Sequence, residues 1–226
     1  YGSNTTSAIS FDSCPSVKIE YSIFDGLPNY SLRQNLSPAS IEFNKSKVDI
    51  VGCTFSNNMT SDDMINFFNT TFRIAHSNFS RINSDAIDTD FSHGEISNCE
   101  FVDVGNDGID LSGSNVQIEN VKLSYCSDKA VSAGENSRVR IENVFFFENS
   151  LGLVVKDGSA VEVFGSFISE KSDVDIALFQ KKEFYETSSI SIYTDQFNSN
   201  FNLIELGAGN GEMMKILLES FQNFPI

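Results

Sequence analysis

The chain has 226 residues and carries a formal net charge of −16. A surface this acidic repels phosphate backbones, so the composition argues against nucleic acid as a partner. The longest apolar runs, such as residues 144–147, are too short for a membrane-spanning helix, which needs about 20 apolar residues. Tyr1 is not an initiator methionine, and we expect the sequence to be part of a longer chain.

From the N-terminus onward, short apolar segments return at a nearly constant interval. Each segment has one apolar anchor, and successive anchors are 32, 24, 22, 22, 22, 22 and 24 residues apart. The anchors are Ile9, Ile41, Ile65, Ile87, Ile109, Val131, Leu153 and Ala177. A longer turn at residues 25–38 accounts for the first step. A repeat of this length, held over many copies, predicts a stack of equivalent structural units.

Two further columns of apolar residues follow the anchors within each repeat. The second column is Ile19, Ile50, Ile74, Ile96, Ile118, Ile141, Val163 and Ile192. The third column is mostly aromatic: Phe24, Phe55, Phe79, Phe101, Leu123, Phe146 and Ile168. Apolar and polar residues alternate around these columns, which is the period of a strand and not of a helix. We therefore predict an all-β fold, a single parallel β-helix domain over residues 1–226, with about eight to nine coils at residues 7–206.

Asparagine and cysteine residues fall into columns of the same repeat. Asn98, Asn120 and Asn143 share one position between the second and third strands, where stacked amides can satisfy backbone groups. Cys53 and Cys99 share the next position two coils apart, or about 9.6 Å at the strand spacing, beyond the reach of a disulfide. We interpret both columns as structural.

The C-terminal segment contains letters that look like a different fold. L-I-E-L-G-A-G-N-G, at residues 203–211, resembles the first motif of class I methyltransferases. Too little chain follows Gly211 to complete a nucleotide-binding sheet. We instead predict a last coil strand at residues 203–206 and a glycine turn. Residues 207–226 then form a turn and cap segment, in which Met213, Leu217 and Phe221 recur at helical spacing, so we expect a short helix that caps the end of the solenoid.

Side chains next to the inward anchors are expected to point outward on one face of the coil stack. Two ladders result. In the order of the repeats, the first begins with Glu42, Asn66, Asp88 and Asp110. The second begins with Asn44, Phe68, Asp90 and Ser112 and continues to Lys156. Two adjacent repeats bring several carboxylates together, with Asp88 beside Asp110 and Asp85 beside Asp107. Like charges at strand spacing repel by roughly 3 kcal/mol at an effective dielectric constant near 20.

This repulsion suggests three alternatives for the aspartates. They can hold a cation, and calcium is the natural candidate because it takes six to eight oxygen ligands, here from Asp85, Asp88, Asp107 and Asp110. They can be solvated strand and turn residues that cap corners. They can also be catalytic, since Asp88 and Asp110 at strand spacing suit a retaining glycosidase.

The repeat pattern resembles the pectin-lyase-like family of right-handed parallel β-helices, over about residues 7–206. A closer resemblance, carried by V-K-D-G-S and I-A-L-F-Q-K-K within residues 152–182, is to modules of uncharacterised bacterial surface proteins. The family resemblance implies an extracellular or cell-envelope location. It also implies that an extended polysaccharide or cell-surface glycan lies across the outward face, in contact with Glu42, Asn66, Asp88, Asp90, Asp110 and Lys156.

The motifs of the catalytic family members are missing. Neither the paired aspartates plus histidine of polygalacturonases nor the Asp-Pro-His signature of alginate epimerases occurs in the chain. We therefore predict a non-catalytic module that binds or displays an extended carbohydrate, with calcium at the aspartates. The alternatives are a polysaccharide lyase, epimerase or glycosidase that uses Asp88 and Asp110, and a structural spacer or adhesin stalk without a ligand.

Overall fold

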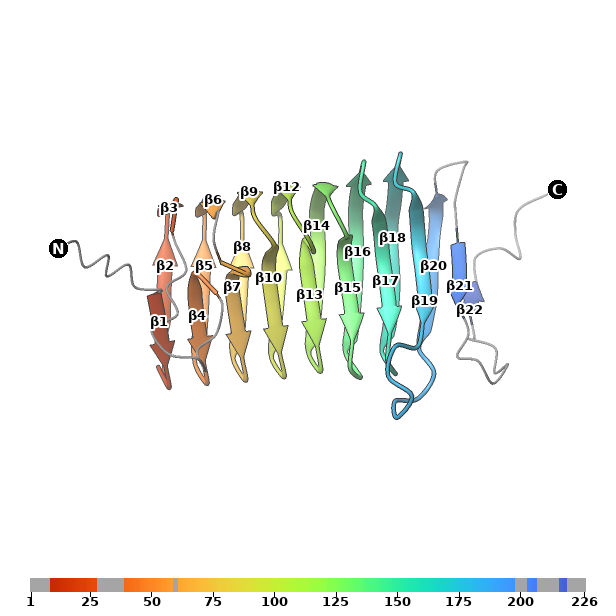
Figure 1. The fold of residues 1–226 in the computed structure, drawn as a ribbon, viewed down its shortest axis with the longest axis horizontal. Coiled ribbons are helices and arrows are strands. Elements are labelled where there is room, and N and C mark those ends of the chain that lie inside the picture. The colour runs from red at the N-terminus through yellow and green to blue at the C-terminus, as the bar shows by residue number, and fades with distance from the viewer. Residues whose placement is uncertain (1–8, 28–38, 59–60, 198–202, 207–215, 219–226) are drawn as a thin grey trace.

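The computed structural model describes residues 9–27, 39–58, 61–197, 203–206 and 216–218, and these form an all-β solenoid (Figure 1). The continuous stretch 61–197 alone makes about six turns, which begin at β7, β10, β13, β15, β17 and β19. The described residues contain no helix, and therefore none that could cross a membrane. The predicted all-β parallel β-helix is thus confirmed.

The first strands of successive turns form one parallel nine-stranded sheet. In sheet order its strands are β1 (Ile9–Asp12), β4 (Ile41–Asn44), β7 (Asp63–Phe68), β10 (Asp85–Asp90), β13 (Ile109–Ser112), β15 (Lys129–Gly134), β17 (Leu151–Lys156), β19 (Val174–Phe179) and β21 (Leu203–Leu206). We call it the first sheet. Its outward face carries the predicted site.

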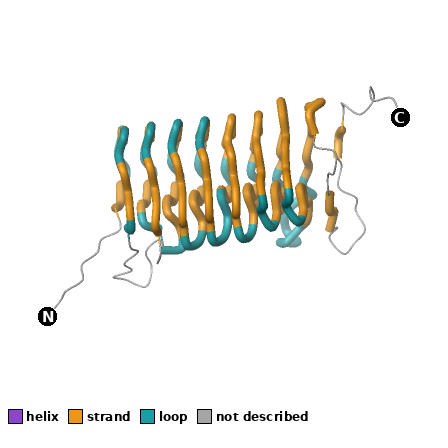
Figure 2. The backbone as a smooth tube through the Cα atoms, turned by 90° about the horizontal axis from the view of Figure 1, so that it is seen from above, coloured by secondary structure: helices purple, strands orange, loops and turns teal. Residues whose placement is uncertain are grey.

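The rest of each turn belongs to a second sheet of 13 strands. Its members are β2 (Val17–Glu20), β5 (Lys47–Val51), β8 (Thr71–Ala75), β11 (His93–Ser97), β14 (Asn115–Cys126), β16 (Arg138–Phe147), β18 (Ala160–Glu170), β20 (Ser189–Phe197) and β22 (Ile216–Leu218), with β3 (Ile23–Asp25), β6 (Thr54–Asn58), β9 (Asn78–Ile82) and β12 (Glu100–Val104). From β14 onward one long strand replaces two, because β14 pairs with both β11 and β12. Figure 2 shows the coils stacked along one axis.

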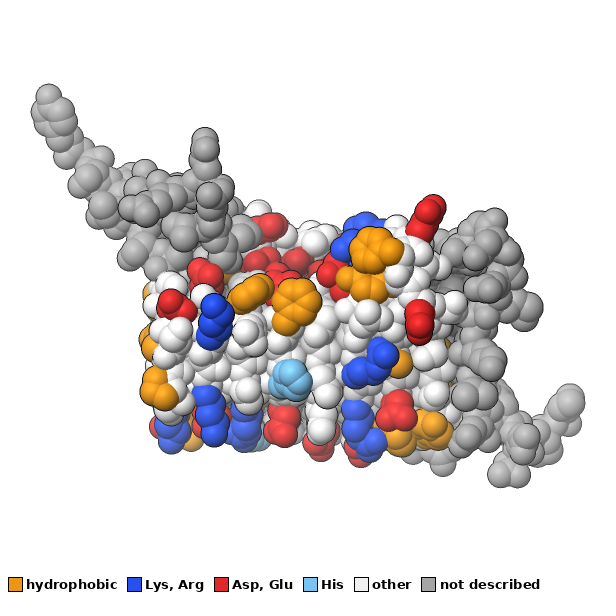
Figure 3. Space-filling model, turned by 90° about the horizontal axis from the view of Figure 1, so that it is seen from below, with side chains coloured by type: hydrophobic (Ala, Val, Ile, Leu, Met, Phe, Trp, Pro, Cys, Tyr) orange, Lys and Arg blue, Asp and Glu red, His pale blue; other side chains and the backbone are white. Residues whose placement is uncertain are grey.

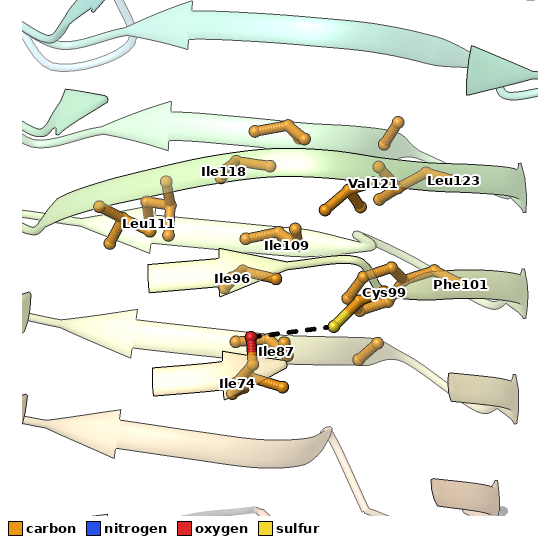
Figure 4. Close-up of a cluster of buried hydrophobic side chains, with 14 of the residues drawn as sticks. Ile74, Ile87, Ile96, Cys99, Phe101, Ile109, Leu111, Ile118, Val121 and Leu123 are labelled. Atoms are coloured by element: carbon orange, nitrogen blue, oxygen red, sulfur yellow. Dashed lines mark hydrogen bonds between the residues drawn. The ribbon is translucent and has the colours of Figure 1, made fainter. Parts of the chain in front are cut away.

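The predicted apolar columns form the interior of the solenoid. Ile87 pairs with Ile65 and Ile109 in the first sheet, and Ile96 pairs with Ile74 and Ile118 in the second. Figure 4 shows the isoleucines of these two columns from Ile74 to Ile118 packed between the two sheets, together with Cys99, whose thiol lies 3.9 Å from the carbonyl oxygen of Ile74. All four cysteines are free.

Aromatic rings stack in register through the third column. The ring centroids of Phe24 and Phe55 are 5.0 Å apart, those of Phe55 and Phe79 4.8 Å, and those of Phe79 and Phe101 4.6 Å. These distances match the spacing of about 4.8 Å between neighbouring strands. Each coil therefore places its ring on the ring of the coil before it.

Two predicted ladder positions late in the chain are wrong by one residue. Leu153 pairs with Ile176 and not with Ala177, which lies beside Val154, so Leu178 also points into the core. A shift of one residue exchanges the two faces of a strand. In the third column Ile168 lies beside Phe145, and Ser169 takes the place beside Phe146, because the register of β18 against β16 shifts after Glu142. The Phe167 ring, from the position beside Val144, meets the Phe146 ring edge to face.

The corners between strands require a left-handed backbone. Asn98, Asn120 and Asn143 have φ values of 53°, 53° and 55°, and Gly52 and Gly165 have 66° and 65° at the equivalent corner. Asparagine and glycine tolerate this region better than other residues. The asparagine column is therefore structural, as predicted. Its main role is to adopt the left-handed backbone of the corner, because the one amide contact within the column, from Asn120 to Asn98, is long at 3.5 Å.

The corner after the first strand of each turn holds a ladder of buried hydroxyl groups, which we did not predict from the sequence. The backbone N–H of Thr70 donates to Ser92 Oγ at 3.0 Å, and that of Ser92 donates to Ser114 Oγ at 3.0 Å. Each serine hydroxyl shares its single proton between two carbonyl oxygens, as Ser92 Oγ does at 3.0 Å from Phe67 and 2.9 Å from Asp90. The signal was present, since Thr70, Ser92 and Ser114 are spaced by 22 residues.

The predicted C-terminal cap segment is partly outside the described residues. Residues 203–206 form β21, as expected. Within 207–226 the structure describes residues 216–218, and these form β22, which pairs in parallel with β20. The expected helix is thus wrong at these residues, because the apolar run I-L-L continues the column of Ile190 and Ile192. The remainder of the segment lies outside the described residues.

Candidate functional site

The outward face of the first sheet has a polar groove at β4, β7 and β10. It has a volume of about 320 Å³. Its lining consists of Glu42, Asp62, Asp63, Asn66, Phe68, Asp85, Asp88 and Asp90, which we call the acidic groove. Figure 3 shows acidic side chains gathered on this face, next to hydrophobic ones. Six carboxyl groups in one groove make its negative charge the main property of the site.

Strand register places the aspartates as the repeat predicted. Asp88 lies beside Asn66 on one side and Asp110 on the other, and Asp85 lies beside Asp63. The amide of Asn66 donates to Asp88 at 2.9 Å and to Asp90 at 3.4 Å. Asn66 therefore links two of the three β10 carboxylates that line the groove.

Three carboxylates, one that lines the groove and two beside it, come close enough to share an ion. Asp85, Asp107 and Asp110 each offer an oxygen atom, and these atoms lie within 4.8 Å of one another. We call these residues the carboxylate triad. Asp85 and Asp107 are buried, and Asp110 is half-buried. Of the four predicted metal ligands, Asp88 is not in this group and lines the acidic groove instead.

Part of the triad is engaged by the protein itself. Asp85 Oδ1 accepts hydrogen bonds from the backbone N–H of Asp107 at 2.8 Å and from the amide of Asn106 at 2.6 Å. Asp107 accepts from the backbone N–H of Lys129 and from its ammonium group, both at 3.1 Å. The alternative of solvated aspartates is therefore wrong for Asp85 and Asp107, which are buried and accept hydrogen bonds from the backbone of the next coil. Asp110 has no such bond at its buried Oδ1, which has no hydrogen-bond partner.

Burial and mutual repulsion favour the protonated forms of these aspartates. Burial, together with the charges of Asp88 and Asp85, raises the pKa of Asp63 to about 9. Burial and the charges of Asp90 and Asp110 raise the pKa of Asp88 to about 8. A positive charge in the groove would lower both values, because it favours the ionised form.

Burial also raises the pKa values of two triad aspartates, but hydrogen bonds and an ion pair reduce the rise. Burial and the Asp110 charge raise the pKa of Asp107 to about 7, although the Lys129 ammonium opposes the rise. Burial raises the pKa of Asp85 to about 6, opposed by the hydrogen bonds from Asp107 and Asn106. Binding of a cation at either place would therefore be coupled to proton release.

The other predicted contact residues lie at different distances along the sheet. Glu42 lines the acidic groove, and burial raises its pKa. Lys156 is on β17, the third strand after β10, where its side chain lies against Gly134. The structure thus brings Glu42, Asn66, Asp88 and Asp90 together in one groove, places Asp110 beside it, and separates Lys156 from it.

Comparison with known proteins gives the family of the chain. Residues 64–214, about two thirds of the sequence, match the family model described as the right-handed beta helix region. The chain therefore belongs to the right-handed β-helix family, which confirms that part of the resemblance. No curated protein and no solved structure matches the chain. The resemblance to bacterial surface modules stays a prediction.

Proposed function

We propose that this β-helix is a binding module for an extended carbohydrate, which lies across the outward face of the first sheet. The observation that supports this function best is the acidic groove, which is open, polar and built from three adjacent strands. Carboxylate and amide groups offer many acceptors for sugar hydroxyl groups. The regular strand spacing repeats these acceptors along the axis of the solenoid, as an extended chain would require.

A divalent cation, with calcium as the candidate, fits the carboxylate triad. Calcium prefers oxygen ligands, and Asp110 Oδ1 is a buried acceptor without a partner. Asp85, Asp107 and Asp110 would hold the ion, while Lys129 already balances one of their charges. The bound cation would supply positive charge beside the groove. The protein's own contribution is to position the three carboxylates through the backbone and Asn106 hydrogen bonds.

Glycoside hydrolysis is the second candidate, favoured by one observation. The raised pKa of Asp88 keeps a proton on this carboxyl group at neutral pH. Asp110 lies directly beside it in the register of β10 and β13. A protonated acid next to a second carboxylate is the arrangement that glycosidases use. Cleavage would then require Asp110 as well as Asp88.

The function is tested by incubating the protein with a panel of neutral, acidic and amino polysaccharides, in calcium and in EDTA. We expect retention on at least one polymer and no new reducing ends. Calcium alone should raise the thermal midpoint of the wild type but not of Asp110→Asn. Release of reducing ends that Asp110→Asn abolishes would instead establish the enzyme. Retention on no polymer would contradict the proposal and favour a structural spacer.

A further inference from the structure

Two exposed phenylalanines stand at the edge of the acidic groove. Phe68, at the end of β7, lines the groove and is 39% exposed, and Phe91, which follows β10, is 55% exposed. Their rings meet edge to face with centroids 6.1 Å apart. Phe91 lies at a corner that is left-handed in the neighbouring turns as well, with φ of 51° beside 48° at Asn69 and 61° at Gly113. Neither ring belongs to the buried core, so both are accessible to a ligand in the groove.

The protein supplies an ammonium group to the same column of aspartates. Asp63, Asp85 and Asp107 follow one another at the start of successive turns, and Lys129 is at the equivalent position of the next turn. The Lys129 ammonium lies 3.1 Å from Asp107 Oδ1 and 3.2 Å from Oδ2, and it also contacts Asp128. No ion pair reaches an acidic-groove residue from the described part of the chain. This column of aspartates thus binds an ammonium group at its Asp107 end, whereas its Asp63 end has none within the described residues.

Buried polar atoms on this face have no partner within the described residues. Asp63 is 4% exposed, and its carboxyl group receives no hydrogen bond. Ser132 is fully buried on the outward ladder beside Asp110, and its hydroxyl group has no partner either. Such orphaned groups are costly unless a ligand or ion satisfies them. A donor with positive charge suits the carboxyl group, and an ammonium group offers three donors and no acceptor.

We propose that the carbohydrate bound in the acidic groove is an amino-sugar polymer with free, protonated amines. The inference rests on the proposed function and names its substrate class. The amines lie among Asp63, Asp88 and Asp90, as the Lys129 ammonium lies on Asp107. The sugar rings pack on Phe68 and Phe91, whose faces also attract the cationic groups. An N-acetylated or neutral polymer of the same length offers the rings but not the charge.

The proposal is tested by calorimetric titration with glucosamine hexamer and with N-acetylglucosamine hexamer, at pH 6 in EDTA. We expect the glucosamine hexamer to bind at least tenfold more tightly. Phe91→Ala and the double variant Asp88→Asn, Asp90→Asn should each lose tenfold or more. The matched control, Asp49→Asn with Glu95→Gln, removes two charges from the outward face of the second sheet and should bind as the wild type does.

The other outcomes distinguish a failure of the amino-sugar inference from a failure of the proposed carbohydrate binding. If the second-sheet control lost as much affinity for the glucosamine hexamer as the groove variants do, the hexamer would be attracted by the net negative charge of the protein, and the proposal would be overturned. Equal binding of both hexamers, or preference for the acetylated one, would overturn the amino-sugar inference but leave carbohydrate binding intact. Binding of neither hexamer would overturn the inference, and the polysaccharide panel would then decide the proposed function separately.

Discussion

Replacing Phe101 with alanine is expected to lower the free energy of unfolding by about 3–5 kcal/mol. Phe101 is fully buried, and its ring is parallel to that of Phe79 at a centroid distance of 4.6 Å. Removing it opens a cavity in the middle of the stack, where the neighbouring coils are held by their own ladders and cannot close the space. Urea unfolding followed by circular dichroism measures the change.

Phe91→Ala is the matched control for Phe101→Ala. It removes the same side chain from an exposed position, so we expect a loss below about 1 kcal/mol. A solenoid is stabilised by contacts between neighbouring coils. If all the coils unfold together, Phe101→Ala lowers the unfolding midpoint equally for probes in every coil; if they do not, only probes near Phe101 report the change. A loss below about 1 kcal/mol in Phe101→Ala would contradict the stacked core.

The second large effect concerns pH. In the unfolded chain an aspartate titrates near 3.9, whereas in the fold the pKa of Asp63 is about 9 and that of Asp88 about 8. Between these values the folded protein binds more protons than the unfolded chain, so its stability falls as pH rises. We expect stability, without divalent cations, to decline from about pH 4 to pH 9 by several kcal/mol.

Asp63→Asn isolates the largest part of this effect. It replaces the carboxyl group by a neutral amide of similar shape, so the variant should be more stable than the wild type at pH 8, by at least ~1.4 kcal/mol, the equivalent of one pKa unit. Asp103→Asn, at an exposed position, should change nothing. Chemical unfolding at pH 5 and pH 8 in EDTA measures both. A destabilised Asp63→Asn at pH 8 would show that Asp63 is ionised and paired.

Much of the fold could be predicted from sequence because each coil repeats the same environment. The anchors Ile65, Ile87 and Ile109 are 22 residues apart, and the structure pairs them directly. The prediction failed where the repeat length changed, at Ile176 and at Ile168, since an extra or missing residue cannot be placed by counting when neighbouring residues are also apolar. It failed at 216–218 because a short apolar run fits a strand and a helix equally well.

The site was predictable to the level of strand register and no further. Register fixed Asp88 beside Asp110 and Asp85 beside Asp63. It could not show that Lys129 bonds to Asp107, or that Asp88 faces the groove while Asp110 joins the triad, because these depend on side-chain rotation. The sequence placed Phe68 on the outward ladder, but it could not show that the Phe91 ring from the next corner meets it edge to face, because this contact depends on side-chain rotation.

Radical footprinting of the protein with and without bound polymer tests the central claim most directly. Among the exposed aromatic side chains of the described residues, Phe68 and Phe91 lie beside the acidic groove, and Tyr21 and Tyr125 lie elsewhere. If an extended carbohydrate lies on the outward face of the first sheet, the polymer should slow oxidation of Phe68 and Phe91 severalfold and leave Tyr21 and Tyr125 unchanged. Protection of the two tyrosines without protection of the phenylalanines would place the polymer on another face and contradict the account.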